Sequence, residues 1–94
     1  MKKVEKKILS KWFDLVCSGD KTFEFRKDED NIQEGDILIL CEVDEKRKYT
    51  GRFMPCLVGT VLRHSDWQDV PDGFCVISIK ELITRDKAKA AGWL

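Results

Sequence analysis

The sequence contains few of the residues that build metal sites, membrane segments or disulfide frameworks. It has one histidine and four cysteines, and no two cysteines have the Cys-x-x-Cys spacing of a structural zinc site. Each cysteine lies inside an apolar stretch, which favours buried free thiols over disulfides. No apolar run approaches the roughly 20 residues that cross a bilayer, and none follows the first lysines as in a secretory signal. We therefore expect a cytoplasmic protein with no metal and no membrane contact.

Glycine, proline and net charge are also low. Six Gly and two Pro in 94 residues, with 43% hydrophobic residues, do not match the composition of a disordered chain. Seventeen Lys and Arg balance seventeen Asp and Glu, so the overall positive field of a typical duplex-binding protein is absent. A chain of this length supports one hydrophobic core. We predict a single domain over residues 1–94, in which any contact with nucleic acid is local.

The hydrophobic pattern predicts many short strands. The expected strands cover 4–9, 22–26, 37–41, 53–63 and 74–79. The run over 37–41 is apolar without interruption, as in a buried central strand, and Gly59 marks a bend or bulge in the longest strand. Many short strands with tight turns and one early helix predict a mainly β, α+β fold with a small β-barrel of five or six strands.

Two helices are expected around these strands. The first follows Ser10, a good N-cap residue, carries Trp12 on its apolar face and ends at Gly19, which supplies the left-handed residue common at helix ends. The second begins after the cap residue Thr84, and 84–94 is expected to be a weakly docked C-terminal helix or tail.

The most informative pattern follows the first helix. Phe23 and Phe25 alternate with Glu24 and Arg26, which predicts a strand anchored by its apolar face, with the charged face outward. Residues two apart on one strand face are ~7 Å apart, so Glu24 and Arg26 can pair or converge on one ligand, with Lys21 at the mouth of the strand. Lys and Arg donate to carbonyl or phosphate oxygens and Glu accepts from an amino group, so the three suit a planar polar ligand. The same charges also fit a solvated face with a surface ion pair.

The run Gly19-x-Lys21-Thr22-x-Glu24-x-Arg26, followed by Gly35-Asp36 and an apolar strand, resembles the signature of the ASCH family within the PUA-like superfamily. The opening helix, the hairpin around Tyr49-Thr50-Gly51-Arg52 and the last strand resemble an uncharacterised phage and bacterial branch of that family. This resemblance implies a PUA-like barrel with a cleft beside the glycine–lysine motif that accepts RNA or a modified nucleobase. It also implies no metal and no organic cofactor.

On these grounds we predict binding of RNA or a nucleotide through a cleft built from Lys21, Glu24 and Arg26, with Lys27 and Arg52 at its rim. Tyr49 and Trp67 are candidate base-stacking residues, and they fit the ends of a barrel equally well. The cations of Lys46-Arg47-Lys48 offer phosphate contacts, or form a solvated hairpin loop. His64 beside Asp66 has no serine or cysteine nucleophile at a recognisable elbow and is expected to be a bystander.

Two alternatives stay open. Some relatives within the resembling family look like amidohydrolases, which suggests a metal-independent enzyme that acts on an acylated base amine such as that of N4-acetylcytidine. In that reading Lys21 is the base and Glu24 activates water or orients the substrate, although Glu24 stands where those relatives have a threonine nucleophile. This departure favours binding over catalysis. The second alternative is a protein-interaction adaptor without a ligand site, for which the apolar end Trp93-Leu94 offers a contact.

Overall fold

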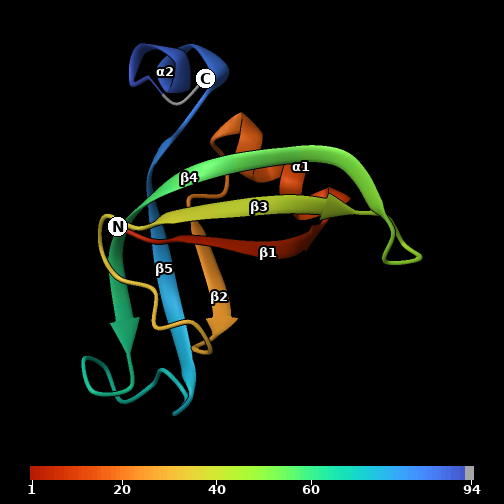
Figure 1. Ribbon diagram of the computed structural model, residues 1–94. Coiled ribbons are helices and arrows are strands. Elements are labelled where there is room, and N and C mark those ends of the chain that lie inside the picture. The colour runs from red at the N-terminus through yellow and green to blue at the C-terminus, as the bar shows by residue number, and fades with distance from the viewer. Residues whose placement is uncertain (93–94) are drawn as a thin grey trace.

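Strand-forming runs dominate the chain, and the computed structural model, which describes residues 1–92, contains five strands and two short helices (Figure 1). In chain order the elements are β1 (Lys3–Leu9), α1 (Ser10–Ser18), β2 (Phe23–Lys27), β3 (Ile37–Val43), β4 (Tyr49–Arg63), β5 (Phe74–Leu82) and α2 (Arg85–Ala90). The prediction of a mainly β, α+β fold with five or six strands in a barrel-like sheet is confirmed.

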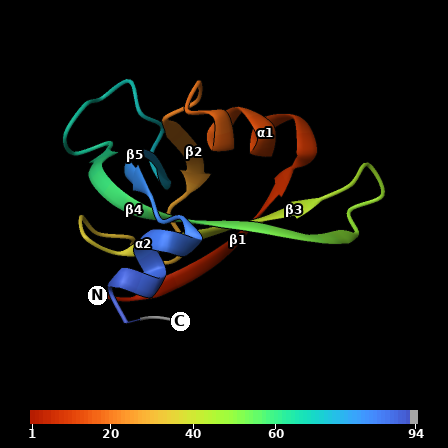
Figure 2. The same cartoon turned by 90° about the horizontal axis from the view of Figure 1, so that it is seen from above.

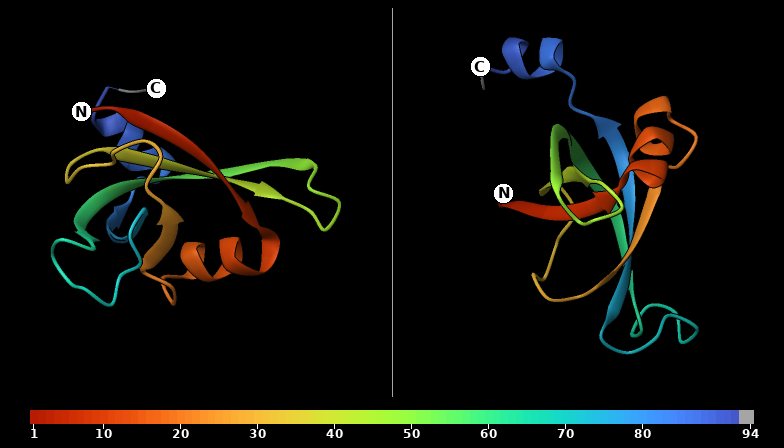
Figure 3. Two further views of the ribbon diagram at one scale, coloured as in Figure 1. Left: turned by 90° about the horizontal axis from the view of Figure 1, so that it is seen from below. Right: turned by 90° about the vertical axis from the view of Figure 1, so that its right-hand side faces the viewer.

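The strands form one curled sheet in the order β1-β3-β4-β5-β2. β1 runs parallel to β3, and all other neighbouring strands are antiparallel. β1 and β2 are therefore the edge strands of a half-barrel, and we call its open side, between these two edges, the seam (Figure 3). The prediction that the 37–41 strand is central was wrong. β4 takes that position because its 15 residues are long enough to pair with β3 at one end and β5 at the other.

The bend of β4 is at Gly59, as predicted. The pairing of β4 with β5 shifts register between Val58 and Val61, which is the mark of a bulge. A Cβ atom added to Gly59 would lie 2.6 Å from the hydroxyl oxygen of Ser78 on β5. That hydroxyl accepts a hydrogen bond from the N–H of Thr60 at 2.7 Å. Glycine therefore lets the two strands approach closely where the sheet curls.

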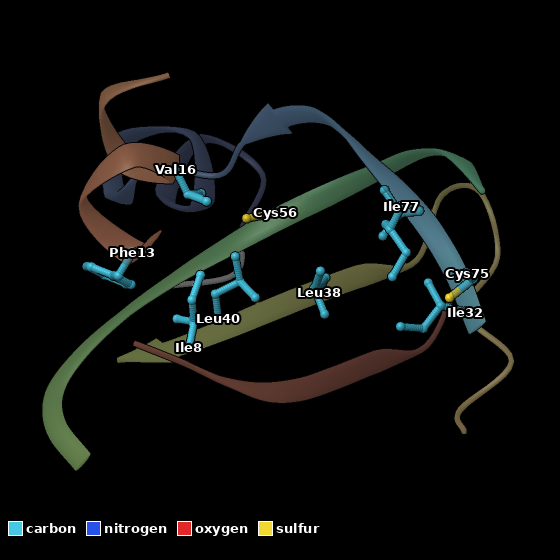
Figure 4. Close-up of a cluster of buried hydrophobic side chains, with 10 residues drawn as sticks. Ile8, Phe13, Val16, Ile32, Leu38, Leu40, Cys56, Cys75 and Ile77 are labelled. Carbon is cyan, nitrogen blue, oxygen red and sulfur yellow. The ribbon is translucent and has the colours of Figure 1, made fainter. Parts of the chain in front are cut away.

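The main core fills the concave side of the half-barrel (Figure 4). Phe13 and Val16 of α1 pack there against buried side chains of β1, β3, β4 and β5. Trp12, predicted on the apolar face of this helix, is instead 41% exposed, because the neighbouring residue Phe13 takes the buried position together with Val16. The N-cap prediction was also wrong: Leu9 occupies the cap position, and the Ser10 hydroxyl donates to the carbonyl of Val43.

The second helix packs on the other face of β3 (Figure 2). The Thr84 hydroxyl accepts from the N–H of Lys87, as expected for an N-cap. Only Ala88 of α2 is buried, where it packs against Ile37 and Ile83. The predicted contact of residues 93–94 lies outside the described residues. Within residues 1–92, neither helix has the length and apolar character needed to span a membrane.

Candidate functional site

A cleft of about 730 Å³ lies along the seam. Its walls come from β1, the start of α1, the segment from Lys21 through β2, the end of β3 and the β3–β4 hairpin. The lining holds five cations and two carboxylates, and these are Lys6, Lys7, Lys21, Arg26, Arg47, Glu5 and Glu24. The cleft thus carries a formal charge of plus three, whereas the whole chain has a net charge of zero. Lys6 is neutralised by Asp30, which lies 2.5 Å from its ammonium group.

The strand that carries the sequence motif has the opposite orientation to the one predicted. Glu24 is 3% exposed, whereas Phe23 and Phe25 are 50% and 52% exposed. The register with β5 explains this, because Glu24 lies opposite the core residue Ile77, and Arg26 lies two positions further along the same face. The charged face of β2 is therefore concave and the phenylalanine face is outward.

Lys21, Glu24 and Arg26 form one connected group, which we call the ion triad. Arg26 donates through Nε and Nη2 to Oε1 of Glu24, at 3.0 and 2.5 Å. The ammonium group of Lys21 contacts Oε2 of Glu24 and donates to the carbonyl of Phe23 at 2.7 Å. The Glu24 side chain is 4% exposed, while the Lys21 and Arg26 side chains are 15% and 23% exposed. The two cations therefore lie between the buried carboxylate and solvent.

A left-handed glycine positions the ion triad. Gly19 has a φ of 85°, ends α1 and donates its N–H to the carbonyl of Val16. The chain then turns back, and the N–H of Lys21 donates to the carbonyl of Leu15 at 3.0 Å. The predicted glycine corner is confirmed, and it fixes the entry of β2 against α1.

Four residues with exposed aromatic side chains also line the cleft, and we call them the aromatic rim. They are Trp12, Phe23, Phe25 and Tyr49, with exposed fractions between 41% and 64%. The rings of Phe23 and Phe25 lie on the outward face of β2, at the edge of the cleft. The Phe25 ring stacks on Phe74, with ring centroids 5.4 Å apart. Exposed aromatic rings beside cations offer stacking surfaces to a planar ligand.

The other two residues of the predicted site, Lys27 and Arg52, do not line the cleft. Arg52 binds the buried carboxylate of Glu42 at 2.6 Å and Asp14 of α1 at 2.9 Å, with its guanidinium 4.9 Å from the Phe13 ring. Hydrogen bonds from Arg52, supported by one from the Thr50 hydroxyl, lower the pKa of Glu42 to about 2. Arg52 thus clamps α1 to the β3–β4 hairpin.

Of the aromatic candidates, Tyr49 lines the cleft and Trp67 does not, although Trp67 is 55% exposed. His64 places Nδ1 2.8 Å from the carbonyl oxygen of Val70 and is also outside the cleft lining. Local pattern did not identify Lys7, which the parallel pairing of β1 brings to the cleft from a distant part of the chain.

The cleft lining offers little for nucleophilic or metal chemistry. Its one thiol among the described residues is Cys41, and burial, with a smaller effect from the Glu5 carboxylate, raises the pKa of that thiol. Within residues 1–92, no three His, Cys, Asp or Glu side chains are grouped so that they could hold a metal ion.

A family model described as "Domain of unknown function (DUF3850)" matches residues 4–79. The chain belongs to this family. The DUF3850 match runs from β1 into β5 and contains the whole ion triad. An "Uncharacterized 12.9 kDa protein in GpA 3'region" of Escherichia phage P2 is 43% identical over 63 residues. That alignment covers 67% of this chain and 57% of the length of the phage protein, so the chain spans little more than half of this relative.

Proposed function

We propose that the seam cleft binds RNA or a nucleotide. The carrying observation is that the aromatic rim and the ion triad meet in one cleft, since stacking surfaces and cations are the two features that single-strand and nucleotide sites share. The resemblance of the motif to the ASCH family of PUA-like domains supports the same proposal. We also propose a cytoplasmic location, which the four free cysteine thiols support.

Each part of the site has a chemical role in this proposal. A base stacks on an exposed ring of the rim, where Phe23 presents one face beside the ion triad. Lys21 and Arg26 donate to phosphate or carbonyl oxygens from the partly exposed sides of their groups. The buried carboxylate of Glu24 holds Lys21 and Arg26 in place, so that both cations face the ligand.

Removal of Lys21 tests the proposal. Wild type and Lys21→Ala are titrated at low salt with hexauridylate, hexaadenylate and the free nucleosides, and binding is followed by calorimetry. We expect binding by the wild type and at least a tenfold loss in the variant, because both a phosphate donor and the partner of Glu24 are removed. Lys89→Ala is the matched control, since it removes one exposed lysine from α2, outside the cleft lining. Equal or absent binding by wild type and Lys21→Ala would contradict the proposal.

The hydrolase alternative makes a different prediction for the same cleft. It needs Glu24 to activate water while Lys21 accepts a proton, yet in the structure these two groups are bound to each other. We therefore expect N4-acetylcytidine to remain acetylated after incubation with a high concentration of the protein. Release of acetate by the wild type and not by Glu24→Gln would favour the hydrolase instead.

The adaptor alternative predicts a flat surface at the motif, with Arg26 paired to an acidic neighbour. Arg26 is indeed paired with Glu24, but the surface beside it is hollowed and lined by exposed rings. The nucleotide proposal accounts for the hollow and the rings together, and the adaptor reading accounts only for the ion pair.

A further inference from the structure

We infer that the cleft has two nucleotide subsites and takes a single-stranded nucleic acid of at least two nucleotides. This inference rests on the proposed function and specifies its ligand. It comes from an arrangement of two side chains that both line the cleft, and this arrangement occurs twice. In each occurrence a lysine ammonium group lies over the face of an exposed aromatic ring. In a third pair, Lys11 over the Trp12 ring at 4.7 Å, the lysine is outside the lining.

The first pair is on the β2 wall of the seam. Lys21 places its ammonium group 5.0 Å from the centroid of the Phe23 ring, which is 50% exposed. The second pair is on the opposite wall, where Lys7 of β1 lies 5.4 Å from the centroid of the Tyr49 ring. Tyr49 is the most exposed residue of the rim, at 64%. Each lysine–ring pair can bind one nucleotide, because the ring stacks on the base and the cation contacts the phosphate. Two such pairs therefore correspond to two nucleotides.

The second pair is held in a preformed position. Arg47 lines the cleft beside Tyr49 and adopts a left-handed backbone with a φ of 65° in the hairpin turn. Asp44 fixes this turn, because its side chain accepts from the N–H groups of Lys46 and Lys48, both at 2.9 Å, while its carbonyl accepts from the N–H of Arg47. Among residues 1–92, no carboxylate lies within ion-pair distance of Lys7 or Arg47, so both charges remain for a phosphate.

A length series of uridylates tests the inference. Uridine monophosphate, the dinucleotide UpU and hexauridylate are titrated into wild type, Tyr49→Ala, Lys7→Gln and Trp67→Ala by calorimetry at several salt concentrations. We expect UpU to bind the wild type about tenfold more tightly than the monophosphate, since one more base stacks. In Tyr49→Ala this gain disappears, while binding of the monophosphate changes by less than about twofold because the Phe23 subsite remains.

The salt dependence gives an independent measure. Lys7→Gln should reduce the slope of log affinity against log salt for hexauridylate by about 0.7, the value for one phosphate contact on a single strand. Trp67→Ala removes an exposed ring outside the cleft and should leave every affinity unchanged. Equal wild-type affinities for the monophosphate, UpU and hexauridylate would overturn the two subsites and leave the proposed function intact. Absence of binding by all three ligands would overturn both.

Discussion

Replacement of Glu24 by glutamine should destabilise the protein strongly. The Glu24 side chain is 4% exposed, contacts two cations and accepts two hydrogen bonds from Arg26 alone. Loss of one partner of a buried ion pair costs about 3–5 kcal/mol. Glutamine keeps one acceptor oxygen, and Lys21 and Arg26 are partly hydrated, so we expect a loss of about 2–4 kcal/mol. This is a large part of the roughly 5–14 kcal/mol available to a domain of this length.

Urea unfolding followed by tryptophan fluorescence measures this change, and a thermal melt should show a fall in Tm of about 10 °C or more. The control is Glu81→Gln, because Glu81 pairs with Lys87 at 3.2 Å with both side chains about half exposed. Loss of such a surface pair should change stability by less than about 1 kcal/mol. A loss below 1 kcal/mol in Glu24→Gln, equal to that of the control, would refute the burial of a paired carboxylate at the cleft floor.

A triple substitution separates the stability of the ion triad from its proposed role in binding. Replacement of Lys21 and Arg26 by methionine and of Glu24 by leucine removes all three charges together and leaves no buried charge unpaired. Buried ion pairs replaced by apolar residues of similar volume are often neutral or more stable. We expect this variant to regain most of the stability lost in Glu24→Gln but not to bind uridylates. Single substitutions cannot separate these two effects, because each leaves a charge of the ion triad unpaired.

Three further predictions concern the scaffold. Burial opposes ionisation of Asp36, but hydrogen bonds from Lys2 and from the backbone N–H of Gln33 outweigh it and hold the pKa of this carboxyl at about 2. The free energy of unfolding should therefore fall as the pH drops from about 4 to about 2 and the carboxylate protonates. Asp36→Asn should flatten that part of the pH–stability curve. Gly59→Ala should cost about 1–3 kcal/mol in urea unfolding, and adding Ser78→Ala should restore part of it by removing the atom that the new methyl group meets. Burial raises the pKa of Cys56 to about 12, so a thiol reagent at neutral pH should label it only after unfolding.

Local features of the fold were predictable from the sequence. Gly19 supplies a left-handed backbone, Thr84 a capping hydroxyl and Gly59 the room for two strands to approach closely. Each of these features depends on a single residue, and all three are present. The order of the strands was not predictable from apolar runs alone. One face of the 37–41 run is buried in the main core below α1, and the start of the other face is covered by α2. A strand in second position that is covered in this way has the same apolar composition as a central strand.

The membership of the ion triad was predictable, but its orientation was not. Alternation along β2 separates two faces without indicating which one is concave, and the larger apolar side chains favoured the wrong choice. Glu24 can face the core because Lys21 and Arg26 neutralise it locally, which lowers the cost of burying its charge. Lys7 was not assigned to the site because it reaches the cleft through strand pairing, which leaves no local signal. Arg47 was considered within the 46–48 loop, as a phosphate contact or as part of a solvated hairpin, and the structure places it in the cleft lining.

The open seam could explain the charged residues of the cleft without any ligand, but it does not explain the aromatic rim. A half-barrel has two unpaired edges, and charged side chains on edge strands discourage pairing with other chains. The lysines of β1 and the ion triad beside β2 serve that purpose whether or not anything binds. Exposed rings have the opposite effect, because aromatic side chains next to a free edge favour association. Edge protection therefore explains the charges of the seam but not the aromatic rim, and substitution of Tyr49 separates the two explanations more sharply than substitution of any cation.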